Sequence, residues 1–322
     1  MANTRLTRLG LQIPSFTFPG VPDDELFERV ASVAVAAESS GFDSLWVMDH
    51  FYQIWSIGRS EEPMLEGYAL LSALAARTER ARLGTMVTGV TYRNPALLAK
   101  TVTTLDVISS GRAILGIGAA WNDEEHRGLG FEFPPVGERM DRLEEAVQIC
   151  RLMFTEESPS FQGRHYRIEK ALNFPRPVTA GGPPILIGGA GEKRTLRLVA
   201  RYGDACNIFG DVETFRHKMH VLDRHCEDLG RDPAEISRTK LGTVVVAPTA
   251  AEADRLGAGL RAARNMDEER YRSTVLSGTP EQVAEQLVPF LESGLDGFIF
   301  NMHQPDAESV ALAGSALAEL LT

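Results

Sequence analysis

The stretch Ser44-Leu-Trp-Val-Met-Asp-His-Phe-Tyr-Gln-Ile-Trp55 decides the fold, because an apolar run in it ends abruptly in an acid, a histidine and several aromatic residues. A short apolar run of this kind is typical of a buried strand. In a barrel of parallel strands, side chains at the carboxyl ends of the strands face the ligand. We therefore expect Asp49 and His50 to lie at the mouth of such a barrel.

Strand-like and helix-like segments alternate along the rest of the chain. The pattern predicts eight strands, each followed by a helix, which is the count for a closed (β/α)8 TIM barrel. The predicted strands are residues 9–13, a segment from 44, 82–90, 111–121, 184–189, 204–209, 238–247 and 297–302. The predicted helices are 23–40, 66–78, 96–108, 138–154, 192–202, 212–229, a region 250–291 broken near 278–280, and 306–321.

Residues 155–184 interrupt this alternation. The segment is rich in glycine and proline, and its residues 161–168 have the pattern of a small hairpin. We interpret it as an insertion between the fourth helix and the fifth strand, placed over the barrel mouth as a candidate lid. Because no repeat or interdomain linker is visible elsewhere, residues 1–322 are predicted to form one domain.

Composition narrows the class of protein. The 322 residues are 43% hydrophobic, enough for a large core, and 44 acids against 33 bases give a net charge of -11. That charge argues against a nucleic-acid partner or an anionic membrane surface. Three cysteines without a C-x-x-C pair fit a reducing cytosol, and no signal-peptide core or membrane-length apolar run is visible. These features predict a soluble, cytoplasmic enzyme with a small-molecule substrate.

The pair Asp49-His50 is the first candidate for chemistry. A histidine at a strand end can give or take a proton near neutral pH, and the neighbouring acid can orient it or bind a polar ring edge. The alternative is a hydrogen-bonded pair that only caps the strand. Trp55 fits either the wall of an aromatic cofactor site or ordinary packing.

A second candidate is the turn in Ile185-Leu-Ile-Gly-Gly-Ala-Gly-Glu-Lys-Arg194. Backbone N–H groups exposed there at the start of a helix suit a phosphate, although an ordinary tight turn has the same glycines. Gly116-Ile-Gly118 is a weak dinucleotide-binding signal, because Trp121 occupies the third glycine position. The two glycines fit a crowded barrel interior or the close approach of a ring. Asn122, at the same strand end, is a candidate hydrogen-bond donor to a ligand or a residue that only satisfies the turn.

Metal and hydrolase chemistry find little support. His217 and His220 lie three residues apart on a helix predicted to cover the outside of the barrel, away from the mouth. The chain has no H-E-x-x-H motif and no Ser/His/Asp order. We predict no metal site.

Five motifs in order resemble the luciferase-like flavin or deazaflavin oxidoreductases over nearly the whole chain. Within that family they resemble the branch that uses the 8-hydroxy-5-deazaflavin coenzyme F420. The motifs are Trp46-Val-Met-Asp-His50, Leu83-Gly-Thr-Met-Val-Thr88 with Tyr92-Arg-Asn-Pro95, Gly116-Ile-Gly-Ala-Ala-Trp-Asn122, Pro134-Pro-Val-Gly-Glu-Arg139 and Ile187-Gly-Gly-Ala190.

The resemblance implies roles for particular residues. His50 would lie beside the reactive face of the deazaflavin and help to move the substrate proton, while Asp49 would contact the cofactor. Trp55 is assigned to the catalytic set, although it follows the histidine one residue later than the family's aromatic residue. The remaining cofactor-binding residues would be Met86 and Val87, joined by a non-prolyl cis peptide bond behind the ring, with Thr88, Asn122, Gly188, Gly189 and Ala190.

The resemblance also implies an activity, hydride transfer between coenzyme F420 and an unidentified small organic substrate. Relatives that act on a sugar phosphate carry a glutamate where this chain has Ala119, so sugar-phosphate oxidation is not expected. The alternatives are an FMN-dependent monooxygenase on the same fold and a non-catalytic flavin-binding protein. Family members often form homodimers, and we expect one here.

Overall fold

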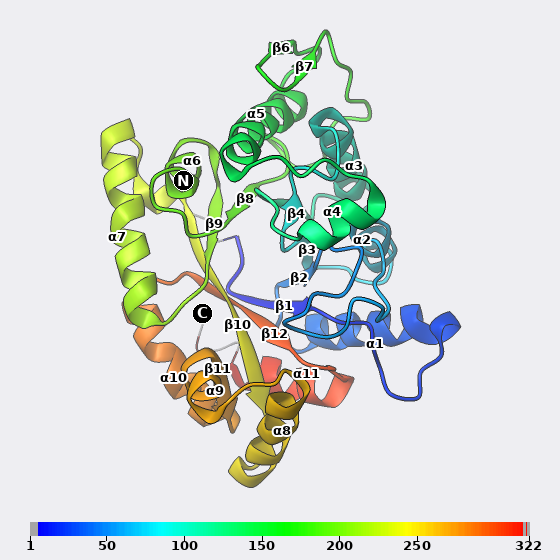
Figure 1. Cartoon of the computed structure of the whole chain (residues 1–322), viewed down its shortest axis with the longest axis vertical. Helices are drawn as coiled ribbons and strands as arrows, with labels where there is room; N and C mark the ends of the chain where they lie inside the picture. The colour runs from blue at the N-terminus through cyan, green and yellow to red at the C-terminus, as the bar shows by residue number, and fades with distance from the viewer. Residues whose placement is uncertain (1–5, 318–319, 321–322) are drawn as a thin grey trace.

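Eight parallel strands close into a barrel, as the sequence predicts. The computed structural model describes residues 6–317 and 320. The strands pair in a ring in the order β1, β2, β3, β5, β8, β9, β10 and β12, and β12 pairs again with β1 (Figure 1). They are β1 (Leu9–Ile13), β2 (Ser44–Val47), β3 (Arg82–Thr85), β5 (Ala113–Gly118), β8 (Ile185–Gly188), β9 (Ala205–Ile208), β10 (Ser237–Val246) and β12 (Gly297–Met302).

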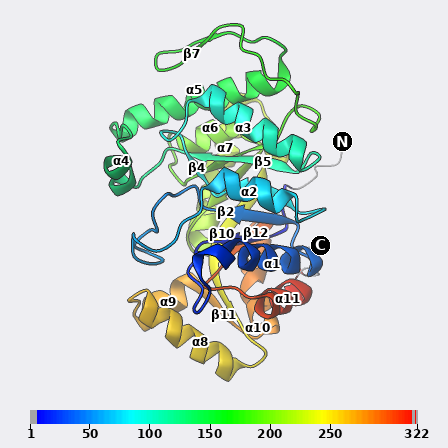
Figure 2. The ribbon, with the colours of Figure 1, turned by 90° about the vertical axis from the view of Figure 1, so that its right-hand side faces the viewer.

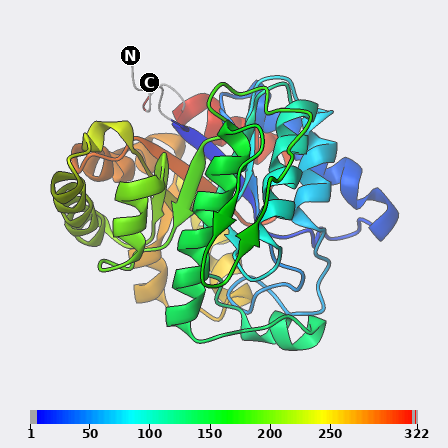
Figure 3. The same ribbon diagram turned by 90° about the horizontal axis from the view of Figure 1, so that it is seen from above.

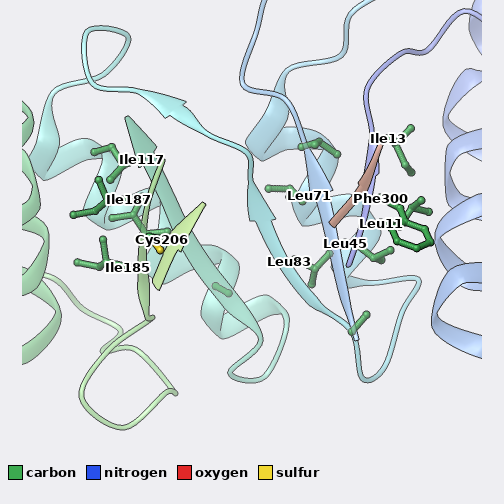
Figure 4. Packing of buried hydrophobic residues seen from close by; sticks show 14 of the residues in the cluster. Leu11, Ile13, Leu45, Leu71, Leu83, Ile117, Ile185, Ile187, Cys206 and Phe300 are labelled. Carbon is green, nitrogen blue, oxygen red and sulfur yellow. The ribbon is translucent and has the colours of Figure 1, made fainter. Parts of the chain in front are cut away.

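Helices surround the strands, so that strand and helix alternate along most of the chain. Apolar side chains on the outer faces of the strands pack against these helices and form the main core (Figure 4). The helices are α1 (Leu26–Ser39), α2 (Gly67–Ala75), α3 (Pro95–Ile108), α5 (Val136–Thr155), α6 (Thr195–Tyr202), α7 (Val212–Leu229), α8 (Ala250–Ala263), α10 (Pro280–Glu292) and α11 (Ala307–Leu317). Among the described residues, no helix combines the length and apolar character needed to cross a bilayer.

Most predicted elements are confirmed, and the differences are local. The third strand is interrupted after β3 and resumes as β4 (Thr88–Gly89), with a cis peptide bond between Met86 and Val87. The break near 278–280 holds a short strand, β11 (Val275–Gly278), which follows α9 (Glu268–Thr274) and pairs with β10. A seven-residue helix, α4 (Asp123–Leu129), was not predicted. The last predicted helical residues lie in part outside the described residues.

The insertion at 155–184 contains the expected hairpin, β6 (Phe161–Gln162) and β7 (Arg167–Ile168), but it is not a lid. The Glu145 carboxylate on α5 accepts the N–H groups of residues 164–166 at 2.7–3.0 Å. Further along, the Asn173 side chain donates to Thr103 on α3 at 2.8 Å. The segment therefore lies along the outside of α5 and α3 (Figures 2 and 3), and its predicted place over the mouth is wrong.

A small second core fills the barrel itself. It consists of inward-facing residues from several strands: Leu6, Trp46, Met86, Ile114, Leu186, Ala205 and Ile299. Val87 and Leu241 pack against this cluster but are only partly buried. Side chains therefore fill the barrel interior below Val87 and Leu241, and the interior is accessible at the level of these two residues.

We expect Gly116→Ala to destabilise the barrel, because a Cβ there would lie 1.9 Å from the Thr85 carbonyl oxygen. Overpacking against backbone should cost about 1–3 kcal/mol or more. Gly137→Ala, in the first turn of α5, is the control: its Cβ meets nothing within 4 Å, and a gain of about 0.5–1 kcal/mol is expected. Urea unfolding measures both, and a loss below about 1 kcal/mol for Gly116→Ala would contradict this packing.

Candidate active site

The candidate active site lies at the carboxyl ends of the barrel strands. Asp49 and His50 directly follow β2, Met86 to Thr88 lie between β3 and β4, Asn122 follows β5, and Gly188 ends β8. Because all the barrel strands are parallel, these ends meet at one mouth. The structure thus brings the predicted residues to the same end of the barrel, but it gives several of them different partners.

His50 is paired with a carboxylate that the sequence analysis did not find. Its Nδ1 lies 2.7 Å from Oε2 of Glu125, a residue of α4. The Glu125 side chain is fully buried, and the His50 side chain is 13% exposed. The histidine therefore has one ring edge fixed inside the protein while part of the ring stays accessible from the mouth.

Four donors satisfy the buried Glu125 carboxylate. Besides His50, the Tyr92 hydroxyl donates to Oε2 at 2.8 Å, and the backbone N–H groups of Phe51 and Tyr52 donate to Oε1. Burial raises the pKa of Glu125, but the hydrogen bond and charge of His50 and the other donors outweigh it, so the net pKa lies below 4.5. The stability that this pairing contributes is thus present above pH 4.5 and is lost as the pH falls through the folded-state pKa.

This pairing fixes the proton on neutral His50. An ionised carboxylate can only accept hydrogen bonds, so Nδ1 must carry the hydrogen and Nε2 keeps its lone pair. A side chain held in this way is prepared to take a proton at Nε2 and to hold the resulting charge against Glu125.

Asp49 does not extend into the mouth, in contrast to the prediction that it contacts the cofactor. Its side chain is fully buried, and Arg93 donates to both carboxylate oxygens at 2.6 and 2.9 Å. Arg93 also binds Glu66 in the N-cap position of α2. Burial raises the pKa of Asp49 to about 6, and Arg93 opposes this shift. The bidentate pair fixes the loop after β4 to the end of β2, so Asp49 positions the strand end that carries His50.

The aromatic residue beside His50 is Trp121, which was not predicted, and the catalytic role predicted for Trp55 stays a prediction. The Trp121 ring lies 5.3 Å from the His50 ring in an edge-to-face arrangement and is 50% exposed. Trp55 is 75% exposed and lines a different recess at the rim. The helix α4 follows Trp121 directly and therefore brings this indole and Glu125 to the histidine together.

Val87 forms the inner wall of the mouth, supported by glycines on the neighbouring strands. A Cβ at Gly118 or Gly188 would lie 2.9 Å from the Val87 methyl groups, so only glycine leaves room for this side chain. The Thr88 side chain faces the other way: it is buried and bonded to Tyr68 and Thr85 at 2.7 and 2.8 Å. The predicted cis peptide bond between Met86 and Val87 is present, whereas the Met86 and Thr88 side chains are buried.

Asn122 and the turn after β8 have N–H groups that find no acceptor in the described part of the chain. Asn122 caps α4 through Oδ1, which accepts from the Glu124 N–H at 3.1 Å, and no bond from its Nδ2 is found among the described residues. In the turn, Gly189 adopts a φ of 124°, a left-handed value that favours glycine. Within the same described part of the chain, the N–H groups of Ala190 and Gly191 have no acceptor. Arg194, near the start of the following helix, is paired with Asp141 on α5.

Sequence reasoning missed Glu125 and Arg93 because their partners lie 75 and 44 residues away in the chain. A local signal for Glu125 was available. Asn122 followed by three acids is a typical helix start, and it places an acid one turn beyond the end of the fourth strand.

The barrel, with a histidine and its buried carboxylate at the mouth, has the architecture of a barrel enzyme that binds a ligand over the strand ends. The model of the luciferase-like monooxygenase family matches residues 7–258, and this chain belongs to that family. The family expected from the sequence motifs is thereby confirmed.

Individual relatives agree with this assignment. An F420-dependent glucose-6-phosphate dehydrogenase of Nocardia farcinica is 30% identical over 299 residues, which are 85% of this chain and 87% of that protein. A monooxygenase from Streptomyces bottropensis superposes with a TM-score of 0.82 at 21% identity, covering 98% of both chains. An F420-dependent secondary alcohol dehydrogenase, solved with an F420-acetone adduct, gives 0.80 at 23% identity, covering 98% of this chain and 99% of that one. At these identities, the solved structures show a shared fold.

We expect Glu125→Gln to reverse the tautomer of His50. The backbone N–H groups of Phe51 and Tyr52 can only donate, so the Gln oxygen must face them and its NH2 must donate to Nδ1 of His50. Nitrogen-15 NMR of the histidine rings measures this change. His126 is an internal control, because its Nδ1 lies 2.6 Å from the Asn122 carbonyl in the unmodified chain. An unchanged His50 tautomer would show that Glu125 does not orient the ring.

Proposed function

We propose that this protein is a coenzyme F420-dependent oxidoreductase that acts on a small organic substrate at the barrel mouth. The observation that carries the proposal is the His50 and Glu125 pair, held at 2.7 Å at the same end of the barrel as the partly exposed Val87. The name of the relative from Nocardia farcinica supports the choice of coenzyme. A protein that only binds a flavin has no need of a histidine oriented by a buried carboxylate.

The residues present fit a planar coenzyme with an anionic tail. Val87 offers an apolar surface at the level where the barrel opens, and the glycines beside it permit close approach of a ring. The N–H groups of Ala190 and Gly191 and the amide of Asn122 are donors that a tail and a ring edge require. Val87, Asn122 and the turn 188–191 are therefore the residues that we assign to the cofactor.

The mechanism that we propose depends on His50. When bound, a deazaflavin supplies a two-electron hydride donor or acceptor. His50 Nε2 takes the proton of the substrate during oxidation or returns it during reduction, and Glu125 stabilises the imidazolium that forms. Trp121 contacts the edge of the imidazole, and the Asp49–Arg93 pair holds the strand end in place. Positioning of this kind supplies much of the catalysis in hydride transfer.

The substrate proposed here is not a sugar phosphate, although the relative from Nocardia farcinica is named for one. The position where such relatives carry a glutamate is Ala119 in this chain. Its side chain packs against the core, and its carbonyl accepts from Arg139 at 3.0 Å. No carboxylate stands there to assist His50.

The coenzyme can be tested by titration of the purified protein with oxidised F420 and with FMN. We expect F420 to bind at least tenfold more tightly, and the protein with reduced F420 to consume no oxygen. Gly189→Asp should weaken F420 binding at least tenfold relative to Gly189→Asn, which has the same shape and the same left-handed backbone without the charge. Preference for FMN with oxygen uptake would move the protein to the monooxygenases, and equal affinity of the two variants would remove the turn from the site.

We further propose a homodimer in the cytoplasm. Four apolar side chains on α3 and the adjoining insertion are at least half exposed, which favours an interface there: Leu97, Leu172, Phe174 and Val178. We expect the double change Leu172→Ser and Phe174→Ser to yield monomers by light scattering, while Val35→Ser on α1 leaves the dimer intact. A monomeric unmodified chain would refute the dimer.

A further inference from the structure

A second recess opens at the rim of the barrel, beside the candidate active site. Its volume is about 320 Å³, within the range of small-molecule sites. Its walls come from the segments that follow β1, β2 and β12, together with the end of α8, so it lies on the same side of the barrel as His50. The lining residues are Ser15, Thr17, Trp55, Ile57, Gly58, Arg59, Glu62, Ala263, His303 and Gln304.

Arg264 follows Ala263 in the chain and interacts electrostatically with His303, two residues that line the recess, and it is a cation without a compensating acid among the described residues. Its two terminal nitrogens donate only to uncharged oxygens, those of Thr243 at 3.2 Å and Asn301 at 3.3 Å. Its Nε is buried and has no partner in the part of the chain that the structure describes. Burial lowers the pKa of Arg264 to about 10, the direction expected for a charge that lacks a counter-ion.

A line of hydrogen bonds joins Arg264 to the wall of the active site. Asn301 accepts from Arg264 and donates to the Gln12 side chain at 2.7 Å. Gln12 in turn donates to the Met86 carbonyl at 3.3 Å, at the cis peptide that precedes Val87. A line of hydrogen bonds thus leads from the guanidinium to the peptide bond before Val87, the residue that we assign to the coenzyme.

The charges around the recess favour a monoanion. His303 lies close enough to Arg264 and Glu62 to respond to both charges, and its Nδ1 is buried without a partner among the described residues. The Glu62 oxygens are held by Thr17 at 3.0 Å and by the Arg59 N–H at 3.1 Å. Arg59 and Glu62 both line the recess and carry opposite charges, so the partly buried Arg264 guanidinium and the His303 imidazole are left to match the single charge of a carboxylate.

Building on the proposed function, we infer that the substrate is a small organic acid whose carboxylate is bound by Arg264 and His303. Trp55 and Ile57 line the same recess and provide an apolar wall for the carbon skeleton. The exposed indole of Trp55, which does not contact His50, thereby has a role in substrate binding.

Calorimetry with acetate, butanoate and benzoate tests this inference, with the matching amides and inorganic phosphate as comparisons. Each titration is made with and without saturating oxidised F420. We expect at least one of the acids to bind at least tenfold more tightly than its amide and more tightly than phosphate. Arg264→Gln should weaken the binding of that acid at least tenfold. Arg255→Gln, a change at an exposed arginine of α8, should leave its affinity unchanged.

The stability of Arg264→Gln separates a binding role from a structural one. Gln can replace the bonds to Thr243 and Asn301 without a buried charge, so we expect the Tm to rise by about 2 °C. Binding of none of the three acids, equal binding of acid and amide, unchanged binding by Arg264→Gln or a lowered Tm would each overturn the inference. Failure of the unmodified chain to bind F420 would instead overturn the proposed function. A failed inference and a failed proposed function are therefore distinguishable.

Discussion

The buried carboxylate of Glu125 needs donors, and the barrel mouth is arranged around them. Its four hydrogen bonds tie together α4, the loop after β2 and the loop after β4. An unsatisfied buried carboxylate would be costly, so these three segments have one preferred arrangement. The position and the tautomer of His50 follow from it. The same bonds that complete the fold at this end therefore also set the chemistry of the histidine.

The interior of the barrel divides into an apolar floor and a polar upper layer. Trp46 and its neighbours close the floor, while Gln12, Asn301 and Thr243 form the hydrogen-bonded layer that leads to Arg264. A cation in this layer without a counter-ion lowers the stability of the unliganded fold. A bound carboxylate would supply that counter-ion. At Arg264, the proposed binding role lowers the stability of the unliganded fold. At Glu125, the same hydrogen bonds stabilise the fold and orient His50.

Much of the fold could be predicted from the sequence, because hydrophobic periodicity and the glycine and proline residues between elements are local signals. The bounds of residues 9–13, 212–229 and 297–302 are those of β1, α7 and β12. The motif around His50 predicted that the histidine lies at the mouth, because the end of a strand can be recognised from a few consecutive residues. The insertion was misplaced over the mouth because its course depends on Glu145 and Thr103, which hold it against α5 and α3.

The partners in the site could not be predicted because they come together only when the barrel closes. Asp49 is next to His50 in sequence, yet its carboxylate belongs to Arg93, and the acid that holds His50 is Glu125 on another element. The aromatic neighbour is likewise Trp121, since α4 carries it to the histidine, whereas Trp55 lies at the rim. Residue types indicated which polar side chains follow the strands at the mouth, and the assignment of each partner required the three-dimensional arrangement.

The central claim is that the mouth between His50 and Val87 is the coenzyme site, and a crystal structure of the protein soaked with oxidised F420 tests it most directly. We expect the ring against Val87, the tail at the turn 188–191 and His50 Nε2 turned toward the substrate side of the ring. A ring bound instead in the groove between α8 and α11, which has a volume of about 470 Å³, would contradict it.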